Sequence, residues 1–331
     1  MVKILAVAVG RPQKLTNVIQ NPQDNAYVLK KAILSGLVKR LRMLGHSPSI
    51  DFNLDYLQDE PGASLEVAIA QAIKPLPAAI LTIASSARYA AQSVTDSIPI
   101  VFTVISDPEG EGAIENPRDP IENATGVSGH LKQAAHDCLE KFQKTFRDLH
   151  DVYAIHQPFF PPAHGAMPRL RRLAKRKGWN LTFLTVGDRS QIGQRLSQIQ
   201  ASGGSGKGLF VIPEDLVVSE APLFMNQVQN QWRIPVFLPV MEFAGNPDPA
   251  APQPPYPAIG AYGIPGENIG TAAAEIINDL RGVFSGTKPP HQIPPKVITK
   301  CEWWVNRSIA NTFNPGYPPP AGTPGGPDRE F

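Results

Sequence analysis

The sequence predicts an α/β protein of two Rossmann-like lobes, each built on a doubly wound parallel sheet. Apolar, strand-like segments alternate with amphipathic helical segments, and this alternation starts a second time after residue 130. A chain of 331 residues is also long for one compact core, since domains of about 100–150 residues are the most common. Strands that alternate with helices favour parallel pairing, with helices on both faces of the sheet.

The first half of the chain supplies the first lobe. Its predicted strands are 3–9, 49–54, 79–83 and 99–104, and the helices between them are 26–44, 65–73 and 86–94. Two of these strands, within ILTIA and PIVFTVI, are continuous apolar runs, which is typical of parallel strands buried on both faces. Residues 125–129, in which Gly126 and Gly129 flank a short apolar turn, are interpreted as the boundary between the lobes.

The second lobe repeats the pattern. Its predicted strands are 151–155, 180–186, 208–212 and 235–238, and its helices are 131–146, 167–177, 192–200 and 220–231. Residues 259–298 add two strands and a helix, which are too few for a third domain, so we expect them to complete the two earlier sheets. The chain then crosses between lobes more than once. We predict lobe 1 at 1–127 plus 241–290 and lobe 2 at 128–240 plus 291–331, with a Pro/Gly-rich tail from 314.

Composition argues against several classes of partner. The net charge of +2 gives no reason to expect nucleic acid or an anionic membrane. The basic run Arg169–Lys177 has an apolar inner face, so it is interpreted as a solvated helix face. The apolar run Ile4–Val9 is shorter than the ~7–15 residues of a signal peptide's apolar region, and no segment approaches the ~20 apolar residues that span a bilayer.

No motif for catalysis, a metal or a cofactor is found, so none is expected. The glycine-rich segment 203–208 resembles a phosphate loop, but Lys207 is followed by Gly208 instead of Ser or Thr, and the segment precedes a strand. Cys138 and Cys301 are interpreted as two small buried apolar residues, with a disulfide as the alternative. An enzyme of the doubly wound class would need a nucleophile–base pair or a metal cluster.

Polar residues follow the predicted strands at their carboxyl ends, which is where open parallel sheets bind ligands. If the lobes face each other, these residues line one cleft. Ser85 and Ser86 also begin a helix, where they either cap its N–H groups or help them hold a ligand carboxylate. The residues found by this reasoning are Arg11, Ser85, Ser86, Asp107, Asp215 and Glu242.

Four segments resemble ABC transporter substrate-binding proteins of the tryptophan/tyrosine type. They are IASSARYAAQSVTDSIPIVFTVISDPEGEGAIENPRDPIENATGVSG, LFVIPEDLVVSEA, IPVFLPVMEF and AIGAYGIPGENIGTAAAEIINDLRGVFSGTKP. The resemblance implies a class I periplasmic-binding-protein fold, with three crossovers at a hinge, and adds Tyr262 to the expected ligand-binding residues. Pro265 departs from the pattern, because amino-acid-binding members carry Asp there and proline cannot pair with a ligand ammonium.

The resemblance implies the solute-binding component of an ABC importer, which closes on a small polar or amino-acid-like ligand and presents it to permease subunits. The alternative is a ligand sensor of the same fold that acts on a regulator. The resemblance implies a periplasmic location, whereas the lack of a recognisable signal peptide leaves the cytoplasm open.

Overall fold

A computed structural model describes most of the chain. The described residues are 2–9, 25–56, 64–105, 123–129, 131–146, 148–158, 161–202, 205–212, 217, 220–238, 240–241, 244–245, 257–313, 321 and 327–330. They form two compact α/β units, which confirms the predicted fold class. Unit 1 contains residues 1–21, 30–130 and 266–299, and unit 2 contains residues 22–29, 131–265 and 300–331.

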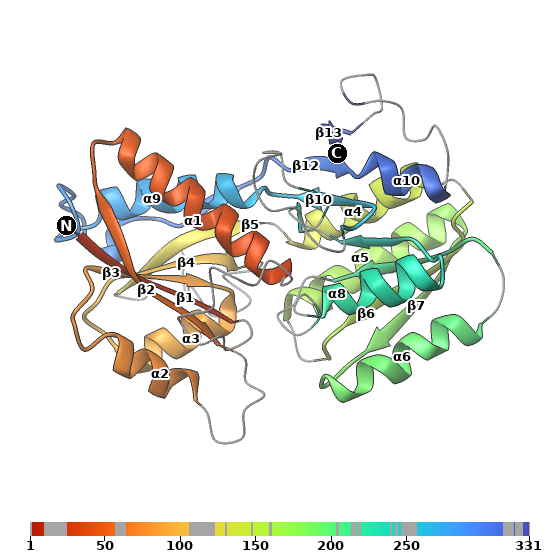
Figure 1. The fold of residues 1–331 in the computed structure, drawn as a ribbon, viewed down its shortest axis with the longest axis horizontal. Coiled ribbons are helices and arrows are strands. Elements are labelled where there is room, and N and C mark those ends of the chain that lie inside the picture. Colours follow the sequence, from red (N-terminus) through yellow and green to blue (C-terminus); the bar gives the residue numbers. More distant parts are fainter. Residues whose placement is uncertain are drawn as a thin grey trace. The chain divides into compact units, whose positions relative to one another are not determined.

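Unit 1 is built on a parallel six-stranded sheet. Its order is β2 (Pro48–Tyr56), β1 (Val2–Val9), β3 (Ala79–Ile83), β4 (Ile100–Ile105), β5 (Ala124–Gly129), β11 (Lys296–Ile298). Helices α2 (Leu65–Ala72) and α3 (Ser85–Val94) cover one face (Figure 1), where Leu5 and Val7 of β1 pack against them. Helices α1 (Asn25–Met43) and α9 (Gly266–Asp279) cover the other face.

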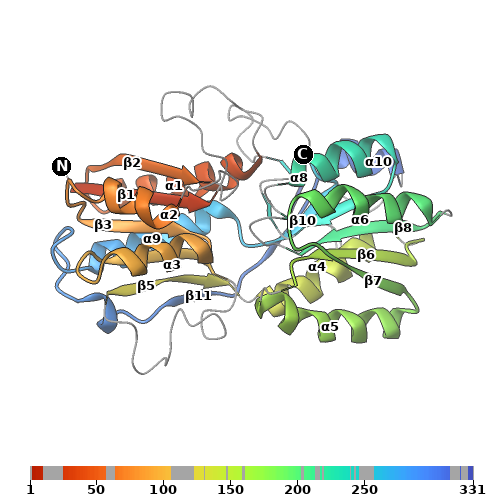
Figure 2. The same cartoon turned by 90° about the horizontal axis from the view of Figure 1, so that it is seen from below.

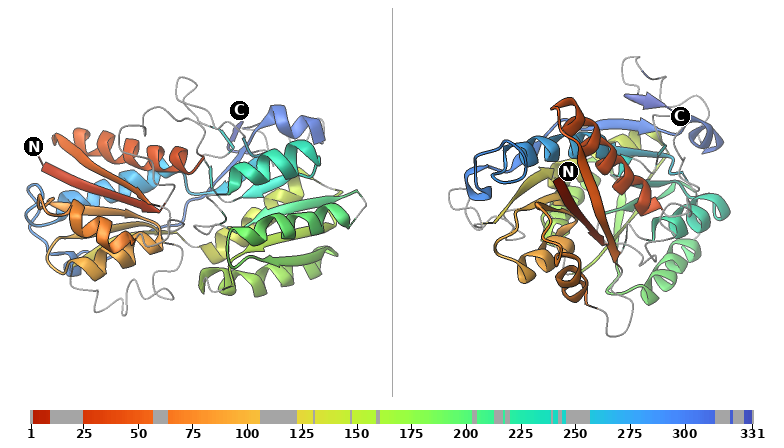
Figure 3. Two further views of the ribbon diagram at one scale, coloured as in Figure 1. Left: turned by 60° about the horizontal axis from the view of Figure 1, so that its bottom comes forward. Right: turned by 60° about the vertical axis from the view of Figure 1, so that its left-hand side comes forward.

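Helices α1 and α9 pack with their backbones in direct contact. A Cβ added to Gly270 of α9 would overlap the carbonyl oxygen of Ile33, and one added to Gly36 of α1 would overlap the carbonyl oxygen of Glu267. The two helices, coloured red and blue, lie side by side in both views of Figure 3. Glycine is therefore needed at both positions so that a segment from late in the chain can join unit 1.

Unit 2 is built on a seven-stranded sheet. Its order is β7 (Asn180–Thr185), β6 (Asp151–His156), β8 (Lys207–Val211), β9 (Val236–Leu238), β10 (Gly260–Gly263), β12 (Glu302–Val305), β13 (Arg329–Glu330). Strand β12 is antiparallel to β10, whereas the other described pairs are parallel.

Alternate residues of the unit 2 strands face opposite layers of helices, as the two-residue period of a strand requires. Val152 and Ala154 of β6 pack in the cluster of α4 (Leu131–Thr145) and α5 (Pro161–Lys177). Ile155 packs in the cluster of α6 (Ser190–Ala201) and the π-helix η1 (Phe224–Gln231), which follows the short α8 (Ala221–Leu223). Figure 2 shows the two layers, and α10 (Arg307–Phe313) adds Ala310 to the first cluster.

The structure corrects several expectations. Residues 124–129 are the buried strand β5 of unit 1 instead of a boundary turn, and Gly126 is required there because a Cβ would overlap Phe102. Trp303 and Trp304 lie in a strand, β12, that the sequence had not predicted, and both are buried. Helix α5 begins at Pro161, before the predicted start at 167.

The assignment of the late segments to units also differs from the prediction. Residues 241–265 were placed with lobe 1, but β10 pairs with β9, so this segment belongs to unit 2. Residues 291–299 were placed with lobe 2, but β11 pairs with β5 in unit 1. Apart from residues 22–29, which group with unit 2, the chain passes between the units three times, after residues 130, 265 and 299. Among the described helices, none combines the length and the apolar character that a bilayer span needs.

Candidate functional site

The two sheets share a topological feature that marks ligand sites in open α/β folds. Strand order reverses between β1 and β3 in unit 1, and between β6 and β8 in unit 2. Ligands of such sheets bind beyond the carboxyl ends of the strands at this reversal, because the following loops turn away in opposite directions. The residues that end β3 and β6 are therefore the first candidates in the described part of the chain.

Ser85 and Ser86 lie at this position in unit 1. They follow β3 directly and are the first two residues of α3. The residue at the N-cap is Ala84, whose side chain makes no capping hydrogen bond. The N-cap residue therefore supplies no side-chain acceptor to the first turn of α3. Ser85 and Ser86 are thus helical residues and not the N-cap, and the carboxylate site at the start of α3 stays a prediction.

Backbone strain gathers at the same edge of unit 1. Ala84 has a φ of 82° and Val104, at the end of the neighbouring strand β4, has a φ of 59°. Both are unusual for residues with a side chain, above all for a β-branched one. The backbone N–H of Ala84 donates to the carbonyl oxygen of Thr103 at 3.1 Å, and the Thr103 hydroxyl donates to the Thr82 carbonyl oxygen at 2.8 Å. Strain held in this way is typical of ligand-binding edges.

His156 lies at the reversal of strand order in unit 2, on the strand that corresponds to β1 of unit 1. It ends β6 and is buried. Its Nδ1 lies 2.9 Å from the carbonyl oxygen of Gln157, which can only accept, so Nδ1 carries a proton. In the neutral ring, Nε2 then accepts from the hydroxyl of Thr185, at 3.2 Å, at the end of β7. The imidazole thus ties two neighbouring strand ends together.

Sequence reasoning missed His156. Its place at the end of β6, directly after the predicted strand 151–155, is the same signal that selected Ser85. Four other predicted residues, Arg11, Asp107, Asp215 and Glu242, lie outside the described residues.

Tyr262 of β10 packs within unit 2. It pairs with Trp303 of β12 and packs against the cluster beneath α4. The ammonium of Lys141 lies 5.7 Å from the centre of the Tyr262 ring and 4.7 Å from that of Trp303. Burial, followed by the charges of neighbouring groups, raises the pKa of Tyr262 to about 12. Its hydroxyl is therefore neutral at physiological pH, and the side chain is half-buried.

Both cysteines are free thiols close to Tyr262. Burial raises the pKa of Cys138 well above its ordinary value and raises that of Cys301 to about 11. A thiol with so high a pKa is a poor nucleophile near neutral pH, because the thiolate is the reactive form. Cys138 is buried, as the sequence predicted, whereas Cys301 is only half-buried, and neither forms the alternative disulfide.

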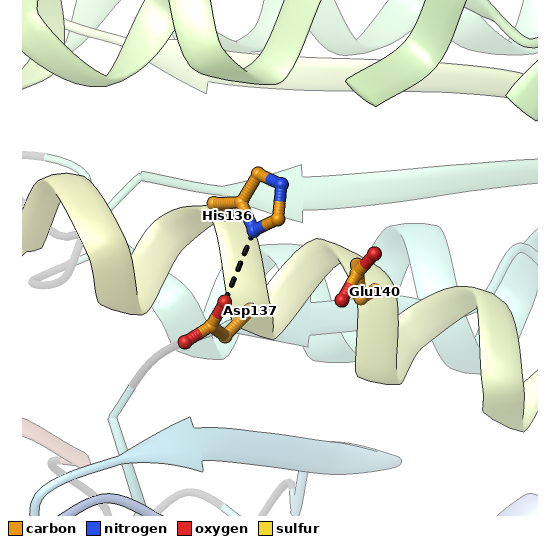
Figure 4. Close-up of side chains that lie close together, drawn as sticks. All are labelled: His136, Asp137 and Glu140. Carbon is orange, nitrogen blue, oxygen red and sulfur yellow. Dashed lines mark hydrogen bonds and ion pairs between the residues drawn. The ribbon is translucent and has the colours of Figure 1, made fainter. Parts of the chain in front are cut away.

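Three side chains of α4 bring potential metal ligands together. One ligand atom each from His136, Asp137 and Glu140 lies within 4.8 Å of the others. Figure 4 shows the His136 ring turned to Asp137, with Nδ1 3.0 Å from Oδ1. The guanidinium of Arg176 on α5 donates to Nε2 at 3.1 Å. Both ring nitrogens are thus engaged, and a cation already occupies the side where a metal would bind, so the cluster joins α5 to α4.

Lys207 belongs to the glycine-rich segment that resembles a phosphate loop, and its contacts show what this residue does. The residue is buried in β8, and its Nζ donates to the carbonyl oxygen of Ile199 at 2.9 Å. Ile199 lies in the last turn of α6, where carbonyl groups lack partners within the helix. Lys207 therefore caps α6 and has a structural role.

Comparisons with known proteins give a consistent result. The model of the family described as ABC transporter substrate binding protein matches residues 28–315. The chain is also similar to a tyrosine-binding protein of Clostridioides difficile (strain R20291), with 22% identity over 281 residues that cover 84% of this chain and 75% of the relative.

Solved structures share the fold. A Streptococcus pneumonia ABC domain in complex with L-Trp has a TM-score of 0.70 and 16% identity, with 93% of this chain and 94% of that chain covered. A ligand-free, open substrate-binding protein with adhesive properties from Clostridium difficile has a TM-score of 0.60 and 18% identity, with 100% and 99% covered.

Proposed function

Because the chain belongs to the ABC transporter substrate binding protein family, we propose that it binds a small polar or amino-acid-like solute and delivers it to the permease subunits of an ABC importer. The match over residues 28–315, which includes most of both sheets, is the observation that carries this proposal. The family is one of substrate-binding proteins and not of enzymes. Its usual place of action, outside the cytoplasm, is part of the proposal.

The ligand that we propose carries a carboxylate and an apolar or aromatic group. Tyrosine and tryptophan are named for the two relatives above, and the position of the α3 N-terminus at the carboxyl end of β3 supports carboxylate binding in unit 1. Pro265 is buried before α9 and offers no side-chain acceptor for a ligand ammonium. We therefore expect the carboxylate to contribute more to affinity than the amino group.

A thermal-shift comparison of matched ligands tests this expectation. The probes are L-tyrosine and L-tryptophan beside 3-(4-hydroxyphenyl)propionate and 3-indolepropionate, which lack only the amino group. A ligand at 100 times its Kd stabilises the protein by about 2.7 kcal/mol. We expect the deaminated compounds to give shifts similar to those of the amino acids. A shift with the amino acids alone would show that another residue supplies the ammonium site, and no shift with any of the four would contradict this ligand class.

The residues proposed to contact the ligand are those predicted from the strand ends and the family resemblance, with His156 added to position the ends of β6 and β7. We expect Asp107→Ala and Asp215→Ala each to abolish the ligand-induced shift. Asp96 and Asp148 are matched controls, because they are exposed and precede β4 and β6, at the amino ends of the strands. Equal shifts in all four variants would mean that the strand-end residues do not bind the ligand.

Closure of the lobes on the ligand stays a prediction. Small-angle X-ray scattering with and without the stabilising ligand measures it directly. We expect the radius of gyration to fall when the ligand is added, because closure shortens the particle. An unchanged radius in the presence of a full thermal shift would show binding without closure.

A further inference from the structure

The outer face of α5 carries a high density of positive charge, although the net charge of the whole chain is only +2. Helix α5 has the sequence PPAHGAMPRLRRLAKRK, which contains no acidic residue. Leu170, Leu173 and Ala174 are buried in the core of unit 2, and α5 runs along the outside of that unit (Figure 2). The exposed residues of its last two turns are Arg171, Arg172, Lys175, Arg176 and Lys177. We name these five residues the basic face.

Folding alone does not account for the basic face. Arg171 and Lys175, like Arg172 and Arg176, are four residues apart, where like charges destabilise a helix. Basic residues in the last turn interact favourably with the helix dipole, but this effect fades within one turn and does not extend to Arg171 and Arg172.

Most of this charge is not neutralised by carboxylates in the described part of the chain. Arg176 donates to His136, which in turn contacts Asp137. The guanidinium of Arg171 lies 5.1 Å from the centre of the Phe183 ring. None of the described ion pairs involves the basic face. The cations are therefore available to an anionic partner.

The chemistry of the face indicates the kind of partner. Interfaces between proteins usually need a buried apolar or aromatic centre. The large apolar residues that are exposed in the described structure, Met43, Val67, Leu76, Tyr89, Leu223 and Val297, all lie outside α5. A row of long, flexible cations without an apolar anchor suits a surface of many mobile anionic groups. We propose that the basic face binds the anionic headgroups of a phospholipid membrane, which would hold the protein near the bilayer independently of its solute site.

Vesicle co-sedimentation of the full-length protein tests the proposal. The vesicles are phosphatidylcholine alone and phosphatidylcholine mixed with phosphatidylglycerol. The test variant is the triple substitution Arg171→Gln, Arg172→Gln and Lys175→Gln. The control variant, Arg42→Gln, Lys74→Gln and Lys300→Gln, removes the same charge from exposed positions outside α5. A third variant, Arg171→Lys and Arg172→Lys, keeps the charge and changes the shape of the headgroup contacts.

We expect the wild type to prefer the phosphatidylglycerol vesicles and the test variant to lose about tenfold or more in affinity, since each cation near such a surface contributes to binding. The control and the lysine variant should bind as the wild type does, and added salt should release all of them. Equal binding by the test and control variants, or equal binding to both vesicles, would overturn the proposal. Binding to an RNA or an acidic peptide without binding to vesicles would also overturn it and assign the face to a macromolecular partner.

Circular dichroism and the thermal midpoint show whether each variant is folded. The ligand-induced thermal shift of the test variant is expected to equal that of the wild type. Loss of vesicle binding with an intact shift separates this surface from the proposed solute site, so the two proposals can fail independently.

Discussion

The two units share five strands in the same order and differ in how each sheet is completed. The order β2-β1-β3-β4-β5 of unit 1 corresponds to β7-β6-β8-β9-β10 of unit 2. Unit 1 then receives β11 parallel to β5, whereas unit 2 receives β12 antiparallel to β10 and β13 beyond it. The shared part consists mainly of short βα repeats, whose right-handed crossovers restrict the order. The positions of the last strands, β11, β12 and β13, depend on segments from late in the chain that return to each sheet.

The units also differ in what fixes these returning segments. In unit 1, α9 packs on α1 through backbone contact at glycines, and Glu275 of α9 bridges Arg40 and Lys296. In unit 2, the buried Gln229 of η1 holds the segment before β10: its Nε2 donates to the Pro257 carbonyl oxygen at 2.9 Å, and its Oε1 accepts from the Ile259 N–H at 3.1 Å. The comparison teaches that close helix packing holds α9 in unit 1, whereas buried hydrogen bonds hold the segment before β10 in unit 2.

The largest effect is expected from Gly270→Ala in unit 1. Its new Cβ would overlap the Ile33 carbonyl oxygen, so α9 must move away from α1, at a cost of about 3 kcal/mol. The matched control is Gly193→Ala in α6 of unit 2, where a Cβ meets no atom within 4 Å. That variant should gain about 0.5–1 kcal/mol from helix propensity. Urea unfolding measures the free energy of unfolding of both variants. An equal change in Gly270→Ala and Gly193→Ala would refute the role of close packing between α1 and α9.

Gln229→Leu should give the next largest loss, in unit 2. The substitution leaves the Pro257 carbonyl and the Ile259 N–H buried without their partner, which costs about 2 kcal/mol. Gln198→Leu on the exposed side of α6 is the control and should change the free energy of unfolding by less than about 0.5 kcal/mol. If the two variants unfold alike, the hydrogen bonds of Gln229 do not hold this segment.

Glu275→Gln should give the smallest loss, because the carboxylate is partly exposed. The hydrogen bond from Lys296 is the main reason that the pKa of Glu275 is lowered, with Arg40 adding to it. A lowered pKa stabilises the folded state fully above the pKa of an unfolded glutamate, about 4.3, and this contribution is lost as the pH falls through the folded-state value. With solvent screening, we expect a loss of about 0.5 kcal/mol near neutral pH.

Urea unfolding at neutral and acidic pH checks the sign of this effect. The difference in the free energy of unfolding between wild type and Glu275→Gln should shrink as the pH falls, because protonation removes the same charge from the wild type. A difference that stays constant with pH would show that the ion pairs do not contribute.

The candidate site was predictable where a polar residue directly follows an apolar run. Ser85 and Ser86 were found in this way, and their place at the start of α3 agrees with the expectation. The same rule applies to His156, which directly follows the predicted strand 151–155. The missing side-chain cap at Ala84 and the strain at Val104 were not predictable, because backbone angles at strand ends depend on the neighbouring strand.

The sequence by itself determined the alternation of strands and helices, the presence of two similar lobes and the family resemblance, because each depends on periodicity or on motifs within short segments. Only the tertiary structure decided that residues 124–129 form a strand, that β12 runs antiparallel to β10, and that the cations of α5 form an exposed face that the described ion pairs do not neutralise. These features depend on residues that lie far away in the chain. Their free energy comes from contacts that exist only after the segments have come together.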